Sequence, residues 1–171
     1  PIFLIASTAV ADHKRLKIGA IIAQTGPLAI TGNTIKNAML LSQRENDPDN
    51  RVELIFEDDA FQAKNTVAAF QKLMLGGAPI AVITFGSSTS MSVATLAEKA
   101  KVPLLALTIV ESITKDRFYS FRYFISTKGL NKQTVKDMQN AGVKRVALLS
   151  TAQDGMLELR DHFLNSYGTG V

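Results

Sequence analysis

Four consecutive hydroxyl residues stand where an apolar run gives way to a helical pattern. The stretch TFGSSTSMS at 84–92 places them at 87–90, directly after Gly86. A hydroxyl at a helix start caps a backbone N–H, which is worth about 1 kcal/mol. A helix N-terminus also suits a carboxylate or phosphate, because it carries partial positive charge and presents free N–H groups. The residues alone leave both interpretations open, a helix cap or an anion seat.

The other residues that could do acid–base or metal chemistry are few. Glu57, Asp58 and Asp59 follow a predicted strand, where carboxylates can bind a metal or act as an acid/base pair. Because no histidine is near them in sequence, solvation of the loop and charge compensation at a helix start are the favoured interpretation. The two histidines, His13 and His162, do not stand beside a nucleophile. A Ser-His-Asp triad is therefore not expected.

Composition and motif searches exclude several other classes of function. The chain has no cysteine, which rules out thiolate metal sites, disulfides and cysteine nucleophiles. TGPLAITGN at 25–33 matches neither the dinucleotide nor the P-loop pattern. The net charge of +4 comes from scattered lysines and arginines, which gives little reason to expect a nucleic-acid partner. The aromatic stretch at 116–124 lacks the glycines of the RNP1 pattern, so a buried strand explains this stretch better than a nucleic-acid platform does. We expect no metal, no cofactor and no nucleic-acid partner.

Apolar runs and helical patterns alternate along the chain, which is typical of βαβ units. Strands are predicted at 16–23, 51–57, 80–84, 103–107 and 145–150, with an extended stretch at 117–125. Helical spacing is found at 35–46, 67–74, 88–100, 131–142 and 154–167. The predicted fold class is α/β, with a mostly parallel sheet and helices on both faces. The loops 24–32, 85–90 and 108–111 would then share the carboxyl edge of the sheet, where such folds bind ligands.

The first eleven residues, PIFLIASTAVA, are similar to the end of a secretory signal. An apolar run at 2–5 is followed by small residues and by Ala9-Val10-Ala11, an A-x-A cleavage pattern. The alternative is an apolar N-terminal strand or arm. With the signal interpretation, residues 1–11 are its remnant, the mature chain begins near Asp12, and the protein is periplasmic or extracellular.

Six motifs follow one another along the chain, namely KIGAIIAQTGPLAITGN, FEDDAF, GSSTS, AEKAKVPLLAL, SITKDRFYSFRYF and KRVALLSTAQDG. In this order they resemble the leucine/isoleucine/valine-binding family of periplasmic substrate-binding proteins, and the similarity covers about 16–167. The resemblance implies a type I periplasmic-binding fold, with a first lobe at 12–125 and the beginning of a second lobe at 126–171. It also implies a non-catalytic component of an ABC importer that closes by a hinge around a small carboxylate, such as an amino acid, and delivers it to a membrane permease.

The same resemblance implies which residues contact the ligand. Through hydroxyls and backbone groups, the serine-rich loop and the loop after the next strand would hold the ligand's carboxylate and ammonium groups. The second loop is one residue shorter than in the family, so Glu111 is the alternative to Val110 as its last contact. Two positions depart from the family pattern, with Thr31 in place of an aromatic and Asp154 in place of a tyrosine. The predicted ligand-binding residues are Thr31, Phe85, Gly86, Ser87, Ser88, Thr89, Thr108, Ile109, Val110 and Asp154.

Length separates the chain from the family it resembles. Family chains run about twice as far and return to complete both lobes, whereas this sequence ends at Val171, so we expect a fragment or a truncated protein that lacks roughly half of the ligand contacts. Two alternative functions remain at this point. One is an α/β enzyme that uses loop 86–90 as an oxyanion or phosphate site, and the other is a sensory receptor domain of the same fold.

Overall fold

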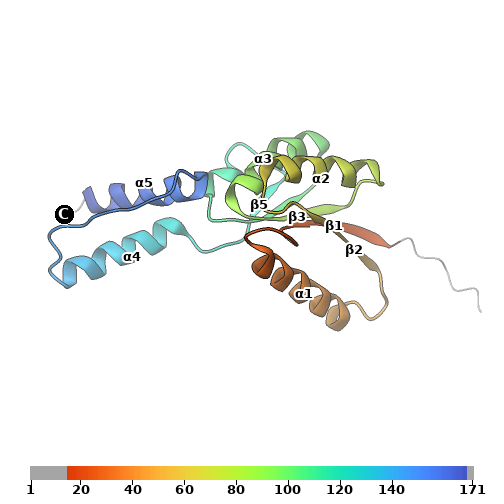
Figure 1. The fold of residues 1–171 in the computed structure, drawn as a ribbon, viewed down its shortest axis with the longest axis horizontal. Coiled ribbons are helices and arrows are strands. Elements are labelled where there is room, and N and C mark those ends of the chain that lie inside the picture. Colours follow the sequence, from red (N-terminus) through yellow and green to blue (C-terminus); the bar gives the residue numbers. More distant parts are fainter. Residues whose placement is uncertain (1–14, 169–171) are drawn as a thin grey trace, which may run out of the picture.

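The computed structural model describes residues 15–168 and arranges them in two parts (Figure 1). Residues 15–125 form a layered α/β unit around one sheet, which we call the sheet unit. Residues 126–168 form a pair of helices that extends to one side, which we call the helical arm. The predicted signal remnant at 1–11 lies outside the described residues.

The sheet has five strands, and every neighbouring pair is parallel. They are β1 (Leu16–Ile22), β2 (Val52–Asp58), β3 (Ala81–Phe85), β4 (Leu104–Leu107) and β5 (Ser120–Arg122), in the order β2-β1-β3-β4-β5. Parallel neighbours need crossover connections, and the helical stretches between the strands supply them. The predicted parallel α/β sheet is therefore confirmed.

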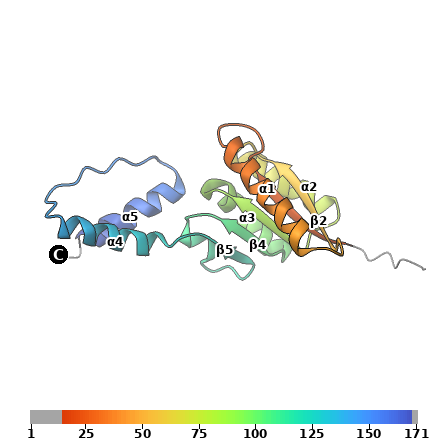
Figure 2. The ribbon, with the colours of Figure 1, turned by 90° about the horizontal axis from the view of Figure 1, so that it is seen from below.

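Helices cover both faces of the sheet, as predicted. The helices are α1 (Ala29–Asn46), α2 (Ala63–Leu75), α3 (Ser87–Ala100), α4 (Thr127–Asn140) and α5 (Asp154–Gly168), with a 3-10 turn η1 (Glu111–Thr114). Figure 1 shows α2 and α3 on one face of the sheet and α1 on the opposite face, and Figure 2 shows α4 and α5 side by side in the helical arm. Within residues 15–168, no helix combines the length and hydropathy that crossing a bilayer requires.

The core lies between the sheet and the pair α2–α3. Ile21, Val82 and Leu104 on the strands are completely buried and pack against Phe70 of α2 and Val93 of α3. This face carries the apolar side chains that alternate along β3 and β4, because successive residues of a strand point to opposite faces. The core therefore fixes the ends of β3 and β4, from which the candidate site is built.

The opposite face is covered by α1 over β1 and β2 but is open over the other edge of the sheet. Leu105 on β4 is 36% exposed and Phe121 on β5 is 52% exposed. The prediction of a buried strand at 116–124 is therefore wrong for aromatic side chains such as Phe118 and Phe121, which are exposed. Only Ser120–Arg122 pairs with β4, as an edge strand, and its Phe121 is paired with Leu105 on the open face.

Helix α1 begins at Ala29, earlier than the pattern starting at Ile35 predicted. Pro27 and the two glycines suggested a loop through residue 33, but Pro27 stands just before the first turn, where a fixed φ and a missing N–H are tolerated. Gly32 is buried on α1 and takes part in the helix through its N–H, which bonds Leu28 O at 2.9 Å. The loop at this edge is consequently shorter than predicted.

The predicted strand at 145–150 is wrong. This segment has no regular structure and runs in an extended path between α4 and α5, with Leu149 completely exposed. An apolar run becomes a strand only when a neighbouring strand satisfies its backbone groups. Among the described residues no strand lies beside it, so the sequence pattern is present without its partner.

Candidate functional site

A small cavity opens at the carboxyl ends of β3 and β4, where the sheet unit meets the start of α5. Its volume is about 170 Å³. The lining residues are Phe61, Phe85, Gly86, Ser87, Ser88, Leu107, Thr108, Ile109, Phe124, Gln153 and Met156. The sheet unit therefore forms one wall, and the residues around the beginning of α5 form the other.

Six of the ten predicted ligand-binding residues line this cavity, namely Phe85, Gly86, Ser87, Ser88, Thr108 and Ile109. Of the other four, Thr89 and Val110 are buried directly beside it, and Asp154 is exposed between Gln153 and the rest of α5. Thr31 is exposed on α1 and does not line the cavity.

The turn from β3 into α3 depends on Gly86. Its φ of 99° and ψ of 160° lie in a region that only glycine adopts without strain, and its N–H bonds Leu107 O at 3.1 Å. Gly86 occupies the N-cap position, and no side chain caps the helix. The helix-cap interpretation of the hydroxyls is therefore wrong.

The hydroxyls of the turn are instead used in several ways. Thr89 Oγ1 donates to Phe85 O at 2.5 Å, and Ser90 Oγ accepts from Thr84 Oγ1 at 2.8 Å, so both brace the turn from inside. Ser87 Oγ accepts from Thr108 Oγ1 at 3.2 Å, which ties the turn to the loop after β4. Ser88 lines the cavity, and its hydroxyl makes no hydrogen bond to another described residue.

Backbone groups complete the polar side of the cavity. The N–H groups of Ser87, Ser88 and Thr89 belong to the first turn of α3 and have no carbonyl within the helix to bond. No other described residue accepts a hydrogen bond from them. Free N–H groups at a helix N-terminus favour an anion, so this side of the cavity is suited to a carboxylate.

Aromatic and aliphatic side chains form the rest of the wall. The rings of Phe61 and Phe85 lie 6.0 Å apart and are tilted by 42°, while Phe124 and Met156 line the same cavity. Sequence analysis missed Phe61, because nothing in the pattern indicated that the residue after EDDA turns back toward β3. The only available signal was the carboxylate before it, since Asp59 Oδ1 accepts the Phe61 N–H at 2.9 Å and holds that turn.

The carboxylate of Asp58, at the end of β2, accepts hydrogen bonds from two loops. Asp58 Oδ1 accepts the N–H groups of Gln24, Thr25 and Ala60 at 2.8, 3.2 and 2.9 Å. Burial raises the pKa of Asp58, but these bonds and one from Thr25 Oγ1 outweigh it, so the pKa lies below its ordinary value. The group of acidic and histidine side chains that could hold a metal among the described residues does not include Asp58. Its hydrogen bonds show that Asp58 holds the loops around it.

Asp59, by contrast, is buried. Burial raises its pKa above the ordinary value, opposed by hydrogen bonds from the Phe61 N–H and from Thr66 Oγ1, and the neighbouring Asp58 raises it further. Its oxygens are used to fix the start of α2 and the Phe61 turn. It consequently shapes the apolar wall of the cavity without lining it.

Asp58→Asn is expected to lower the free energy of unfolding at pH 7 by about 1 kcal/mol, because the charged acceptor is lost from an exposed position. The lowered folded pKa means that the carboxylate adds stability above its unfolded pKa, and that this stability is lost as pH falls through the folded pKa. Urea unfolding at pH 7 and at steps below 3.8 should show the difference from wild type disappearing. Asp49→Asn, at another exposed loop aspartate, is the control; a difference for Asp58→Asn that does not change with pH would contradict the assignment.

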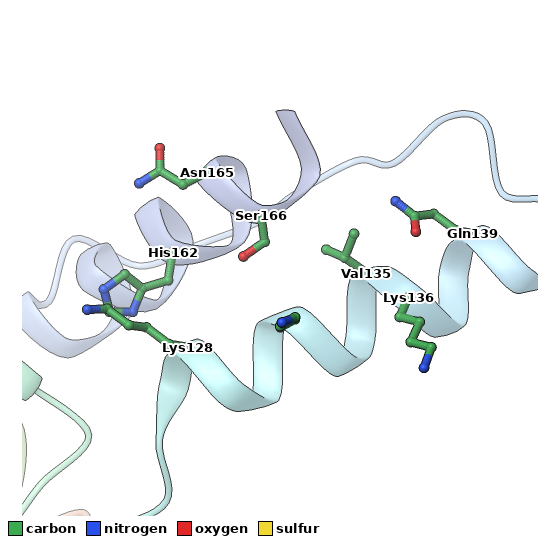
Figure 3. A pocket seen from close by; sticks show the side chains of 8 residues that line it. Lys128, Val135, Lys136, Gln139, His162, Asn165 and Ser166 are labelled. Carbon is green, nitrogen blue, oxygen red and sulfur yellow. The ribbon is translucent and has the colours of Figure 1, made fainter. Parts of the chain in front are cut away.

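A larger cavity of about 600 Å³ lies between α4 and α5 (Figure 3). Three lysines line it, together with Val135, Gln139 and three residues of α5. Figure 3 shows Lys136 pointing away from α5, so the lysines do not converge on one point. This cavity contains none of the predicted site residues and no strand end, and the cavity at the sheet edge remains the candidate site.

The sequence places the chain among known proteins. Residues 15–167 match the periplasmic binding protein family. The chain belongs to this family. No curated protein shows significant sequence similarity to it.

Solved structures agree with the family. The leucine-binding protein LivK from Thermotoga maritima is 22% identical, with a TM-score of 0.82 over 90% of this chain and 45% of LivK. A possible leucine/isoleucine/valine-binding protein from Rhodopirellula baltica SH 1 is 20% identical, with a TM-score of 0.85 over 96% of this chain and 47% of that one. A solute-binding protein of an ABC transporter from Rhodopseudomonas palustris BisB5, in complex with 3,4-dihydroxybenzoic acid, is 24% identical, with a TM-score of 0.82 over 90% of this chain and 44% of that one.

This periplasmic binding protein family member has the type I fold of these structures, and it spans less than half of their length. The order β2-β1-β3-β4-β5 and the parallel pairing are the features that the sheet unit shares with doubly wound folds that bind ligands at the carboxyl edge.

Proposed function

We propose that this chain carries the ligand seat of a solute-binding component of an ABC importer, without catalytic activity. The seat is the cavity at the carboxyl edge, between a first lobe formed by the sheet unit and the start of a second lobe formed by the helical arm. The observation that carries the proposal is the β3–α3 turn, which faces residues 153–156 across this cavity. Family membership and structures of ABC transporter solute-binding proteins support it.

The polar side of the seat binds a carboxylate. The first-turn N–H groups of α3 and the free hydroxyl of Ser88 supply donors, and Thr108 Oγ1 holds Ser87 beside them. Hydrogen bonds to a charged group are worth about 1.5–3 kcal/mol each, so two or three of them orient a small anion. No basic side chain lines the cavity, and the helix N-terminus provides the positive potential instead.

The apolar wall selects the rest of the ligand. Phe61, Phe85, Phe124 and Met156 offer rings and a thioether to a flat or aliphatic body. No acidic side chain lines the described cavity, so an α-ammonium group has no counter-charge there. We therefore favour an aromatic monocarboxylate over an amino acid. Relatives from Rhodopseudomonas palustris in complex with 4-hydroxybenzoate and benzoate support this class, and the leucine-binding relatives support the amino-acid alternative.

Location and partner follow from the same role. A solute-binding component works in the periplasm or outside the cell, and it passes its ligand to a membrane permease. The family description supports this location. The competing enzyme hypothesis would use the same turn as an oxyanion site, but the lining residues offer no histidine, carboxylate or lysine as a general base.

A thermal-shift screen of the chain against benzoate, 4-hydroxybenzoate, leucine and acetate tests the proposal. Ligand at 100 times its Kd adds about 2.7 kcal/mol of stability, which raises Tm by about 5–11 °C for a chain of this size. Benzoates should give the largest shift, and acetate the smallest, because acetate does not fill the apolar wall.

Ser88→Ala supplies the site-specific arm of this experiment. It is expected to weaken binding of the best ligand about tenfold with little change in Tm without ligand. Ser42→Ala, at an exposed hydroxyl on α1, is the matched control and should bind as wild type does. If no carboxylate stabilises the wild-type chain, the proposed function is wrong.

A further inference from the structure

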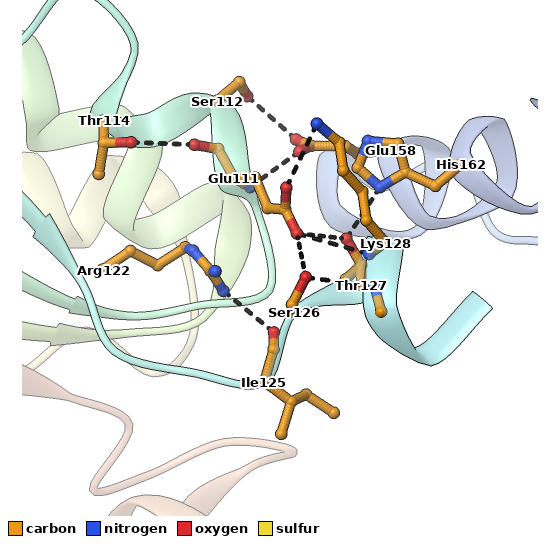
Figure 4. Close-up of polar contacts among 11 residues, drawn as sticks. Glu111, Ser112, Thr114, Arg122, Ile125, Ser126, Thr127, Lys128, Glu158 and His162 are labelled. Carbon is orange, nitrogen blue, oxygen red and sulfur yellow. Dashed lines mark hydrogen bonds and ion pairs between the residues drawn. The ribbon is translucent and has the colours of Figure 1, made fainter. Parts of the chain in front are cut away.

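One carboxylate of α5, that of Glu158, bonds the helical arm directly to the sheet unit. Glu158 on α5 accepts the backbone N–H of Glu111 at 2.8 Å with Oε1, and it accepts the hydroxyl of Ser112 at 3.0 Å with Oε2. Both partners belong to η1, which follows directly on the loop 108–110 beside the candidate seat. Figure 4 shows Glu158 reaching from α5 toward this turn. A contact between residues so far apart in the chain joins the two parts directly.

The carboxylate of Glu111 makes a second set of contacts, at the connection between the two parts. Its Oε1 accepts from Ser126 Oγ at 3.1 Å and from Thr127 Oγ1 at 3.2 Å, and Lys128 Nζ lies 3.8 Å from Oε2 (Figure 4). Burial raises the pKa of Glu111, but the hydrogen bonds from Ser126, from the Lys128 N–H and from Thr127, together with the charge of Arg122, outweigh this effect. The pKa therefore lies below its ordinary value. Glu111 is therefore a charged anchor for the start of α4.

The two glutamates and His162 form a tight group, with one ligand atom from each lying within 4.8 Å of the others. Thr127 Oγ1 donates to Glu111 and also forms a hydrogen bond of 2.9 Å with His162 Nδ1. The ammonium of Lys128 beside Glu111 compensates part of the negative charge. The group thus connects η1, the start of α4 and α5 in one network.

The contacts of Glu111 and Glu158 respond differently to a movement of the arm. Residues 126–128 are the connection itself, so a rotation of the arm about this segment can keep the Glu111 carboxylate bonded. Glu158 lies about 30 residues further along the chain, and its bonds exist only while α5 is docked on η1. Asn131 Nδ2 on α4 donates to Leu159 O on α5 at 2.9 Å. Because this bond couples the two helices, we expect the arm to move as a unit.

Docking of α5 also closes the candidate seat. Gly155, in the first turn of α5, is buried so near to the seat that a Cβ there would overlap Ser87 Oγ and lie 2.8 Å from Ile109 Cγ1. Gln153 and Met156, on either side of it, form one wall of the cavity. The position of α5 therefore decides whether the cavity is complete.

We infer that Glu158 is a positioning residue that latches the helical arm over the ligand seat and so slows ligand release. The effect on release rests on the proposed function, whereas the latch itself is a property of the two parts of the chain. Loss of hydrogen bonds to a charged group predicts a ligand dissociation rate about tenfold faster in Glu158→Ala, with a small change in the association rate.

Distance measurements without ligand test the latch directly. The chain contains no cysteine, so spin labels can be attached specifically at Lys64→Cys on α2 and Lys136→Cys on α4, both exposed. Double electron–electron resonance should give one narrow distance distribution for the wild-type background. Glu158→Ala should add a population at longer distance, and Glu158→Gln, which keeps one carbonyl acceptor, should add a smaller one.

Asp161→Ala is the matched control, since it removes a charge one turn away on α5 where the carboxylate bonds Arg160. It should leave the distribution unchanged. A distribution for Glu158→Ala identical to that of wild type would overturn the latch. If circular dichroism shows that Glu158→Ala does not fold, Glu158→Gln decides in its place, and an unchanged distribution overturns the inference.

The two experiments together distinguish a failure of the latch hypothesis from a failure of the proposed ligand seat. A longer distance in Glu158→Ala together with no binding of any carboxylate to the wild-type chain would support the latch and reject the proposed function. Carboxylate binding to the wild-type chain with an unchanged distance distribution in Glu158→Ala would support the proposed function and reject the latch. A distance shift with an unchanged dissociation rate of the bound carboxylate would overturn the claim that the latch slows release.

Discussion

Gly32→Ala is expected to lower the free energy of unfolding by about 3 kcal/mol, at the upper end of the cost of overpacking a core. A Cβ at this buried position on α1 would overlap the carbonyl oxygen and carbon of Ala23, just after β1. Both atoms belong to the backbone at the carboxyl edge of the sheet, so no side chain can rotate to make room. The whole helix must shift, although alanine itself is favoured over glycine in a helix by about 1 kcal/mol.

Equilibrium unfolding in guanidinium, followed by circular dichroism, measures this effect. Asn37→Ala, on an exposed position of the same helix, is the control and should be neutral or slightly stabilising, because alanine has the higher helix propensity. A Gly32→Ala chain as stable as wild type would mean that α1 does not pack on Ala23 as closely as described.

Gly86→Ala is expected to abolish measurable carboxylate binding and to lower the free energy of unfolding by about 2 kcal/mol. Any residue other than glycine is strained by about 1–3 kcal/mol when it adopts the φ and ψ angles of Gly86. In addition, a Cβ would overlap Cε2 of the Phe61 ring and lie 2.7 Å from Thr89 Oγ1. Relief of these contacts displaces both the apolar wall and the first turn of α3, which together form the seat.

Titration calorimetry with the best ligand of the thermal-shift screen, at a temperature where the variant is folded, measures the loss of binding. Gly142→Ala is the matched control. Gly142 also has a positive φ, of 71°, but a Cβ there would meet nothing within 4 Å. It should cost about 1 kcal/mol of stability, as expected for a non-glycine residue in the left-handed region, and leave affinity unchanged. Wild-type affinity in Gly86→Ala would reject the turn as the ligand seat.

The outline of the fold could be predicted from local patterns. Four of the five strands and all five helices of the described residues fall where apolar runs and helical spacing placed them, within a few residues at most ends. The predictions failed where a pattern needed a partner elsewhere. The apolar run at 145–150 has no neighbouring strand, and the aromatics near β5 lie on the face that no described helix covers. Both features depend on contacts that a local pattern does not contain.

The candidate site also contains residues that could be predicted from the sequence and residues that could not. The β3–α3 turn and the loop after β4 were predictable, because parallel strands bring their carboxyl ends to one edge of the sheet and glycine followed by hydroxyls marks the turn. Phe61 and Met156 were not, because their approach depends on the left-handed turn at residues 60–61 and on the docking of α5.

The sequence by itself determined the parallel α/β sheet, the family, and the turn at Gly86 that presents free N–H groups. These follow from local periodicity, from the order of motifs and from a conformation that only glycine adopts without strain. Only the tertiary structure decided what the hydroxyls do, since it ties Ser87 to Thr108 and leaves Ser88 open to the cavity. It also decided that Glu158 meets η1, because that contact joins residues 46 and 47 positions apart and exists only once both parts have folded.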